Sequence, residues 1–500
     1  MDKLPFSKKD KVKVRFAPAP TGPLHIGGAR TALFNYLFAK KVGGVFLLRI
    51  EDTDIKRSSP EWEKDIIENL KWLGIEWDEG PIRQSERKEI YRKYIEKLYE
   101  KGYLYWCFCS KEELEAKRQD QIARGEPPRY NGQCRNLTKK DIERFKKEGR
   151  KGVLRFKVPS KIIVFNDLIR GKIEFDTSLF GDFVVAKDFE TPLYNLAVVI
   201  DDFEMKITHV IRGEDHLSNT PKQILIQEAL GFPRPKYAHL PLILAPDRSK
   251  LSKRHGAIAV SEYRKMGYLP EALLNFIALL GWNPGTNEEI FSKKELIERF
   301  SLERVQKSGA VFNIKKLEWM NGYYIRKTSL EKLTQLCIPY LEEGRLIEKI
   351  EENKFKIKDT GREIDFEFLK KIISLFQERL KVLSEIKTLS DFFFKEKIEI
   401  DPKLLSWKGM GKEEIKESLE ICLETLEKIE EKNWNKEKIR EIMVKKAESK
   451  EKPDRGWLLW PFRVALTGKP ASPPPFDIAE ILGKKETLKR IKNAIWSLQL

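Results

Sequence analysis

Cysteine is scarce in this chain, and long apolar segments are missing. Five cysteines among 500 residues form an odd, low number, which argues against a disulfide framework and favours reduced thiols. No apolar run reaches the roughly 18–20 residues that a membrane-spanning helix needs. Residues 1–9 contain no apolar segment of signal-peptide length. We therefore expect a cytoplasmic protein that does not use a membrane.

Two common phosphate-binding motifs are missing as well. The chain contains neither a G-x-x-x-x-G-K-[S/T] loop nor a G-x-G-x-x-G turn. Any nucleotide site must therefore be built from a different pattern of residues.

Positive charge is in excess. The 95 lysines and arginines outnumber the 77 aspartates and glutamates, and the formal charge of +18 favours polyanionic partners such as nucleic acid. The Lys/Glu-rich surface of a thermophilic protein or an AT-rich genome explains the same numbers. A hydrophobic content of 41% excludes a wholly disordered chain, and the length predicts several domains.

The N-terminal part has the pattern of a parallel nucleotide-binding sheet. Residues 11–16 predict a strand, residues 29–42 a helix that a glycine pair ends, and residues 45–50 a second strand. Ser59 and Pro60 have the residue types that start a further helix. A strand, a helix and a strand in this order indicate a Rossmann-like α/β domain.

The rest of the chain changes character twice. After Tyr103, three cysteines and a β-rich run over residues 153–185 suggest an inserted α+β module. Sheet signals return with predicted strands at residues 206–212 and 239–245. Residues 331–500 have the pattern of amphipathic helices rich in lysine and glutamate, and we predict that this region is all-helical.

Two short segments contain residue types that are suited to binding the phosphates of a nucleotide. Residues 20–28 (PTGPLHIGG) follow the first strand, and residues 250–254 (KLSKR) follow the last predicted strand of the sheet. His25 can donate to a phosphate oxygen, and Gly27 and Gly28 allow close approach to a nucleotide. Alone, the first segment is more often an ordinary turn and the second a solvated basic loop. Together and in this order they resemble the two signatures of class I aminoacyl-tRNA synthetases.

Longer segments resemble bacterial glutamyl-tRNA synthetases over essentially the whole chain. They are residues 15–22 (RFAPAPTG), 48–54 (LRIEDTD), 194–202 (YNLAVVIDD), 208–216 (THVIRGEDH), 312–321 (FNIKKLEWMN) and 455–468 (RGWLLWPFRVALTG). The resemblance implies that the protein activates glutamate with ATP and Mg²⁺. It implies catalytic roles for His25, Lys250 and Lys253. The residues that it implies for ATP binding are His25, Gly27, Gly28 and Lys253.

A glutamate substrate requires cations for its side chain and an anion for its ammonium group. Arg15 and Arg212 can each bind a carboxylate through two parallel hydrogen bonds. The resemblance places both near the substrate side chain, where Tyr194 adds a hydroxyl, and it places Glu51 near the ammonium group. Ala17 belongs to the same predicted site. Glutamine would be rejected because its amide leaves a buried cation without a charge partner.

Purely structural roles are the alternative for two of these residues. Arg15 could pair with Glu51 or Asp52 across adjacent strands, and Tyr194 could be a core aromatic. Ala19 is a departure from the family, which commonly has serine there, so we expect no hydroxyl contact from that position.

The first three cysteines resemble the zinc insertion of the same family. Cys107 and Cys109 are followed by Cys134, and Asn136 stands where the family often has a histidine ligand. Asparagine is a poor zinc ligand, but Tyr130 could complete the set, as a tyrosine does in a related branch that glutamylates tRNA. Three thiolates and one oxygen would make a closed structural Zn²⁺ site. Three reduced cysteines left from a lost site are the alternative.

The resemblance also implies the domain organisation. Residues 455–468 are similar to the end of the helical anticodon-binding region, which the short relatives lack and which the glutaminyl enzymes replace by a β-barrel. The expected parts are a Rossmann-like catalytic domain in two halves (1–102 and 191–249), an inserted acceptor-binding module (103–190), a domain with the KLSKR loop and helical stem contacts (250–330) and an all-helical anticodon-binding region (331–500).

The sequence therefore predicts a monomeric glutamate–tRNA ligase that charges tRNA(Glu). Whether it also charges tRNA(Gln) stays open. A nucleotidyltransferase that adenylates a small molecule without RNA is one alternative, and the long basic helical region speaks against it. A non-catalytic tRNA-binding relative is another, which the intact set of His25, Lys253, Arg15 and Glu51 disfavours.

Overall fold

The computed structural model describes the chain as two compact units. The described residues are 11–54, 56–252, 254, 259–449, 452 and 454–498. The first unit comprises Met1–Arg264 with Pro270–Leu317, and the second comprises Lys265–Leu269 with Glu318–Leu500. Buried apolar side chains form a core in each of them.

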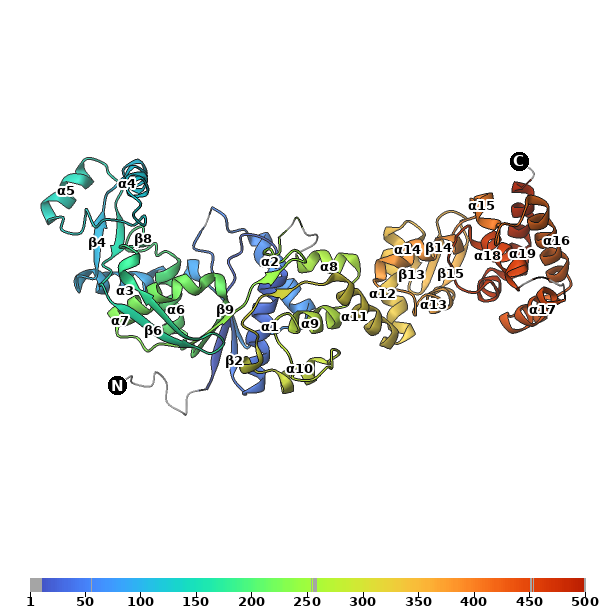
Figure 1. Ribbon diagram of the computed structural model, residues 1–500, viewed down its shortest axis with the longest axis horizontal. Coiled ribbons are helices and arrows are strands. Elements are labelled where there is room, and N and C mark those ends of the chain that lie inside the picture. The colour runs from blue at the N-terminus through green and yellow to red at the C-terminus, as the bar shows by residue number, and fades with distance from the viewer. Residues whose placement is uncertain are drawn as a thin grey trace. The chain divides into compact units, whose positions relative to one another are not determined.

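A parallel sheet forms the centre of the first unit (Figure 1). Its strands are β1 (Lys13–Phe16), β2 (Val45–Ile50), β3 (Glu79–Arg83), β9 (His209–Gly213) and β10 (Lys236–Leu240). The pairs β1–β2, β2–β3 and β9–β10 are parallel. The backbone N–H of Thr208 donates to the carbonyl of Lys13 at 2.9 Å, which brings β9 beside β1. This hydrogen bond joins a three-stranded sheet, β1-β2-β3, to a four-stranded sheet that contains β9 and β10, and the combined order β3-β2-β1-β9-β10 is typical of a Rossmann-like domain.

Helices alternate with these strands or follow them along the chain. They are α1 (Ile26–Lys41), α2 (Pro60–Trp72), α3 (Lys88–Glu100), α6 (Tyr194–Glu204), α7 (Thr220–Leu230), α8 (Val260–Met266), α9 (Pro270–Ala278) and α10 (Lys293–Arg299), and α11 (Ile314–Lys327) follows them. Ser59 caps α2 as predicted, because its hydroxyl accepts the N–H of Glu61 and Pro60 is the first helical residue. Helix α1 begins three residues before the predicted start at residue 29, because His25 caps it.

The inserted segment after β3 contributes to two sheets. Strands β4 (Leu104–Cys107), β5 (Val153–Phe156) and β8 (Val184–Ala186) form an antiparallel sheet accompanied by α4 (Lys111–Ala123) and α5 (Lys139–Lys147), whereas β6 (Ile162–Asp167) and β7 (Gly171–Asp176) form a hairpin. The β-rich character of residues 153–185 agrees with the prediction. Pairing of Tyr237 with Asp167 joins this hairpin to the edge of the catalytic sheet, which the sequence did not indicate.

Two predicted strands have different bounds in the structure. The strand predicted at 206–212 starts at His209, because Lys206 has a φ of 56° and turns the chain after α6. The strand predicted at 239–245 divides in two. Its first part ends β10 at Leu240, and its second part, β11 (Ile243–Leu244), pairs instead with β12 (Ala310–Val311).

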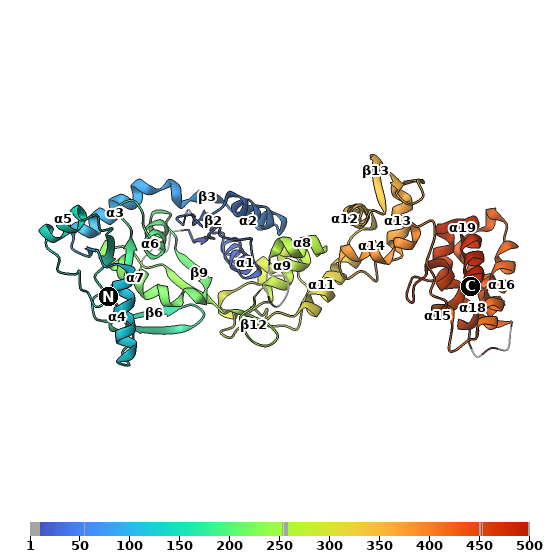
Figure 2. The same cartoon turned by 90° about the horizontal axis from the view of Figure 1, so that it is seen from above.

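The second unit is mainly helical, as predicted. Its helices include α12 (Leu330–Glu343), α13 (Phe366–Ser374), α14 (Ile386–Leu389), α15 (Pro402–Leu405), α16 (Lys412–Glu427), α17 (Lys436–Glu448), α18 (Gly456–Thr467) and α19 (Pro475–Ser497). Helices α16, α18 and α19 lie side by side in both views (Figures 1 and 2).

One part of this unit corrects the all-helical prediction. Strands β13 (Ile347–Glu351), β14 (Lys354–Ile357) and β15 (Glu363–Asp365) form an antiparallel sheet. Phe355 and Ile357 are buried while Lys354 and Lys356 are exposed, which is the alternation of a half-buried strand. The many lysines and glutamates of residues 347–357 made this alternation of buried and exposed residues hard to recognise in the sequence.

Candidate active site

A cavity of about 650 Å³ lies at the carboxyl ends of β1 and β9. The crossovers from these two strands run in opposite directions along the sheet, and a ligand site is expected where the order reverses in this way. The predicted site residues that line the cavity are Arg15, Ala17, His25, Gly27, Gly28, Glu51, Tyr194, Arg212 and Lys250. Lys253 lies outside the described residues. The structure thus brings the two short segments together through His25 and Lys250.

His25 is the N-cap residue of α1, and its ring is oriented by the helix. Its Nδ1 accepts the N–H of Gly28 at 3.0 Å. Burial lowers the pKa of His25 more than the charge of Asp215 raises it, so the ring is neutral and its proton is on Nε2. A Cβ at Gly27 would lie 3.0 Å from Nδ1, so this glycine leaves room for the ring. His25 is therefore suited to donate from Nε2 to a phosphate oxygen, which is the role that the sequence analysis expected and that stays a prediction.

The start of the KLSKR segment (residues 250–254) and the chain after it are anchored beside the cavity by backbone hydrogen bonds. The N–H of Leu251 donates to the carbonyl of Ile243 in β11 at 3.0 Å, and the N–H of Val260 donates to the carbonyl of Leu24 at 2.8 Å. Ala259 also forms a β-bridge with His25. The backbone thereby holds Lys250 near the N-terminus of α1, where a cation can face bound phosphates.

Arg15 is held by a residue that the sequence analysis missed. Its Nε and Nη2 donate to the two carboxylate oxygens of Asp202 at 3.0 and 3.3 Å. The sequence analysis gave Glu51 or Asp52 as the partner of Arg15 if its role were purely structural. These hydrogen bonds are made to Asp202 instead. Asp202 is at the end of an apolar run in α6, and that position was the only available signal that the carboxylate would be buried.

A second buried arginine, also missed, joins Asp202 to Glu51. Nη1 of Arg49 donates to Asp202 at 2.8 Å and Nη2 donates to Oε1 of Glu51 at 2.9 Å. Burial acts to raise the pKa of Asp202, but the charges of Arg15 and Arg49 outweigh it and the pKa is lowered. For Glu51 burial is the stronger influence and raises the pKa. An arriving ammonium group would favour the carboxylate form of Glu51.

Arg212 differs from Arg15 in having only neutral partners. Its Nη2 donates to the hydroxyl of Thr220 at 2.8 Å, and its Nε donates to Nε2 of His239 at 3.3 Å. Among the described residues no carboxylate lies within ion-pair distance of Arg212, and its buried Nη1 has no hydrogen-bond partner there. A buried cation with an open nitrogen at a cavity wall has the charge and geometry that suit a carboxylate ligand.

Tyr194 contributes a hydroxyl at the same wall. Its Oη lies 2.9 Å from Nδ1 of His216, and both residues line the cavity. Burial, assisted by the charge of Arg212, lowers the pKa of His216 to about 4. This second histidine, which the sequence analysis did not single out, is therefore neutral at pH 7 and adds no charge to the cavity.

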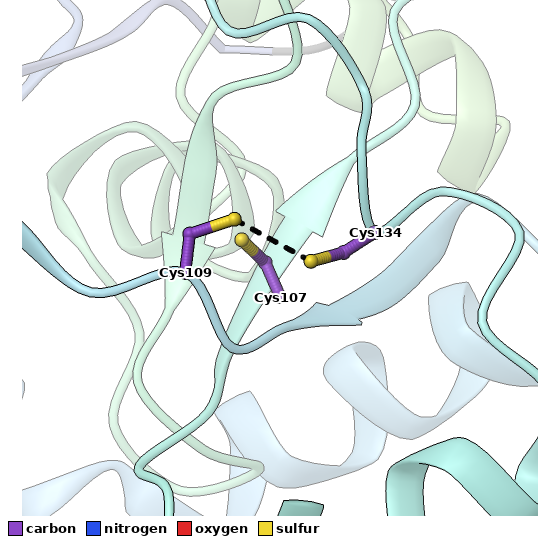
Figure 3. A group of neighbouring side chains, drawn as sticks. All are labelled: Cys107, Cys109 and Cys134. Atoms are coloured by element: carbon purple, nitrogen blue, oxygen red, sulfur yellow. Dashed lines mark hydrogen bonds between the residues drawn. The ribbon is translucent and has the colours of Figure 1, made fainter. Parts of the chain in front are cut away.

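The three predicted cysteine ligands cluster together, as Figure 3 shows. The sulfur atoms of Cys107, Cys109 and Cys134 lie within 4.8 Å of one another, and those of Cys109 and Cys134 are 3.5 Å apart. Tyr130 Oη lies 3.4 Å from Cys107 Sγ and 3.8 Å from Cys109 Sγ. Tetrahedral zinc with Zn–S bonds of about 2.3 Å spaces its sulfur ligands about 3.8 Å apart. These four side chains therefore fit a tetrahedral metal site.

Comparison with known proteins identifies the family. The model of the family "tRNA synthetases class I (E and Q), catalytic domain" matches residues 11–319, and the model "Anticodon binding domain" matches residues 332–495. The chain belongs to the class I tRNA synthetase family that these models describe. The resemblance deduced from the two short segments is thereby confirmed.

Its similar relatives are named as glutamate–tRNA ligases. It is 49% identical over 490 residues to glutamate–tRNA ligase 2 of Thermoanaerobacter pseudethanolicus, with 98% of this chain and 99% of the relative covered. It is 50% identical over 495 residues to glutamate–tRNA ligase 1 of Caldicellulosiruptor saccharolyticus, with 96% and 98% covered. A crystal structure of a glutamate tRNA ligase from Elizabethkingia meningosepticum in complex with its amino acid matches with a TM-score of 0.84 and 37% identity, covering 98% of this chain and 100% of that one.

The sequence analysis expected no membrane-spanning helix. Within the described part of the chain, no helix is both long and apolar enough to cross a bilayer.

Proposed function

We propose that this protein is a glutamate–tRNA ligase, which activates glutamate with ATP and transfers the glutamyl group to tRNA(Glu). The observation that carries the proposal is one cavity that combines Arg212 and its open nitrogen with Glu51, His25 and Lys250. The first two groups match the charges of glutamate, whose carboxylate needs a cation and whose ammonium group needs an anion. The other two match a triphosphate.

In the first step an α-carboxylate oxygen of glutamate attacks the α-phosphorus of ATP. The new P–O bond forms as the bond to the bridging oxygen breaks, and pyrophosphate leaves with that electron pair. His25 donates a hydrogen bond from Nε2 to a phosphate oxygen, and Lys250 supplies positive charge as the pyrophosphate departs. The family resemblance implies the same role for Lys253. Positioning and charge stabilisation suffice, and no protein nucleophile is required.

In the second step the terminal ribose of tRNA accepts the glutamyl group. The class I family implies that the 2′-hydroxyl oxygen attacks the adenylate carbonyl, and AMP leaves. Arg212, Arg15 and Tyr194 hold the side chain of glutamate through both steps, with Glu51 near its ammonium group and Ala17 forming part of the wall. Glutamine in the same position would leave the charge of Arg212 unpaired, which makes its binding unfavourable.

Two cations complete the proposal. Magnesium, which the family implies, neutralises phosphate charge when bound to the nucleotide, and Asp215 on the cavity wall offers an oxygen ligand suited to it. Zinc bound by Cys107, Cys109, Cys134 and Tyr130 would stabilise the fold of the insertion and has no part in the chemistry.

We also propose a monomer in the cytoplasm. The cavity of one chain combines the groups that match glutamate with those that match a triphosphate, which supports a monomer. The cytoplasm is where charged tRNA is used.

The proposal is tested by charging purified tRNAs with labelled glutamate. We expect ATP-dependent charging of tRNA(Glu), with labelled glutamine in place of glutamate as the negative control. Charging of tRNA(Gln) as well would make the enzyme non-discriminating. Failure to charge either tRNA would contradict the proposal. Pyrophosphate release without RNA would then favour a nucleotidyltransferase, and no ATP turnover would favour a non-catalytic tRNA-binding relative.

The zinc site yields a separate prediction. Protein purified without chelators should contain about one zinc per chain, and Cys134→Ser should lose most of it because one of three thiolate ligands is gone. Metal content by mass spectrometry is the measurement. Cys337→Ala is the matched control, because Cys337 is buried in α12 outside the cluster. Zinc-free wild type that also fails to bind added zinc would exclude the site.

A further inference from the structure

Arg212 is the inner end of a chain of buried side chains. Oδ2 of Asp167 lies 2.6 Å from Nδ1 of His239, and Nε2 of His239 lies 3.3 Å from Nε of Arg212. Thr220 Oγ1 lies 3.0 Å from the same Nε2 and accepts Nη2 of Arg212 at 2.8 Å. The exposed fractions are 4% for Asp167, 0% for His239 and Thr220, and 5% for Arg212. Of the four, only Arg212 lines the cavity.

Hydrogen bonds from the His239 ring and from backbone amides keep Asp167 ionised. The carboxylate accepts the N–H groups of Ile169 and Arg170, each at 2.9 Å, and that of His239 at 3.1 Å. Burial alone would raise the pKa of Asp167, but the hydrogen bonds from His239 and from these amides outweigh it and the pKa is lowered. The outer end of the chain is therefore a fixed anion.

That anion selects the tautomer of His239. Burial lowers the pKa of His239 more than Asp167 raises it, so the ring is neutral. Its single N–H is on Nδ1, where the carboxylate accepts it, and this leaves the lone pair on Nε2 facing the Nε–H of Arg212 and the hydroxyl of Thr220 as an acceptor. In the opposite tautomer two N–H groups would face each other at Nε2. The position of Asp167 thus sets the tautomer of His239 that can accept a hydrogen bond from Arg212.

The two arginines of the cavity are therefore held differently. Asp202 binds Arg15 through both of its carboxylate oxygens, which neutralises the charge of that guanidinium at the site. Arg212 is held by neutral acceptors, while its balancing anion, Asp167, is one imidazole ring away. Its Nη1 and its positive charge remain available for a ligand.

We propose that Asp167, His239 and Thr220 are positioning residues that hold Arg212 and keep its charge available for the side-chain carboxylate of glutamate. This inference rests on the proposed function, because it names the group that selects glutamate over glutamine. None of the three residues touches the substrate. They act through the orientation of one guanidinium.

The test compares two replacements of His239 in the full-length enzyme. His239→Leu removes the acceptor for Arg212, and we expect KM for glutamate to rise at least tenfold while KM for ATP changes less than about twofold. His239→Gln retains an oxygen acceptor and should recover most of the loss. Thr220→Val, which removes one hydroxyl at nearly constant shape, should raise KM for glutamate by an intermediate factor.

A control variant on the same strand distinguishes positioning from general loss of structure. Tyr237→Phe removes the buried hydroxyl that lies 3.0 Å from Nε2 of Gln227 but leaves His239 and Arg212 untouched, so its KM for glutamate should equal that of wild type. Equal values for His239→Leu and Tyr237→Phe would overturn the proposal, as would a parallel rise in both KM values. If His239→Leu does not fold, Thr220→Val and His239→Gln decide.

Failure of this inference is distinguishable from failure of the proposed function. Wild type that does not charge tRNA with glutamate contradicts the function. Wild type that charges normally, together with unchanged glutamate kinetics in His239→Leu and Thr220→Val, contradicts only the role of this chain of residues.

Discussion

Replacing Arg212 with glutamine is expected to lower kcat/KM for glutamate by about 10³-fold, or about 4 kcal/mol of binding to the transition state. The reason is that Nη1 of Arg212 is buried without a partner among the described residues. A carboxylate that loses a buried, charged hydrogen-bonding partner loses about 3–5 kcal/mol. The glutamine side chain at position 212 can still form hydrogen bonds and keeps much of the shape of arginine. The fall in kcat/KM therefore measures the contribution of the positive charge. Steady-state aminoacylation with varied glutamate is the measurement.

The size of the effect depends on charge and on geometry, and two variants separate them. Arg212→Lys keeps a positive charge but lacks the planar fork, so its kcat/KM should lie between those of wild type and Arg212→Gln. Arg234→Gln is the control, because Arg234 pairs with Glu228 and does not line the cavity. Unchanged kcat/KM for glutamate in Arg212→Gln would remove Arg212 from the amino-acid site.

Much of the catalytic domain could be predicted because its signals are local. The strand Val45–Ile50 has the predicted bounds, and the pair Ser59 and Pro60 starts a helix as expected. Helix capping and glycine stops act within one turn, so a short stretch of sequence contains the cause and the effect. The segment at 347–357 was missed for the opposite reason, since its exposed lysines and glutamates suit a helix and a strand equally.

The residues that hold the site could not be predicted from local pattern. Asp202 is 187 positions from Arg15, and Asp167 is 72 positions from His239. Such pairs form only when the sheet brings β1, β6, α6 and β10 together. The described residues predicted for glutamate and ATP line the cavity, and family resemblance singles these out. Their partners, Arg49 among them, are buried but do not line the cavity. The sequence pattern does not distinguish such a buried charged residue from one on the surface.

Replacing Asp202 with alanine is expected to lower the free energy of unfolding of the first unit by about 3–5 kcal/mol, because two buried guanidinium groups lose their shared carboxylate. Arg15 would lose both of its described hydrogen bonds to Asp202, and Arg49 would keep Glu51. We expect Tm in scanning calorimetry to fall by roughly 5–15 °C at pH 7. Asp54→Asn is the control, since the ion pair of Asp54 with Arg57 is exposed, and its Tm should match that of wild type.

The effect of Asp202 should also depend on pH with a definite sign. Because the folded protein lowers the pKa of Asp202, its stabilising contribution is fully present above the unfolded pKa of about 4 and is lost as the pH falls below that value. The difference in Tm between wild type and the nearly isosteric Asp202→Asn should therefore be constant from pH 8 to about 5 and should shrink below about 4. A difference that grew on acidification would mean that Asp202 is protonated in the folded protein. In that case it could not be the anion that holds Arg15 beside the substrate.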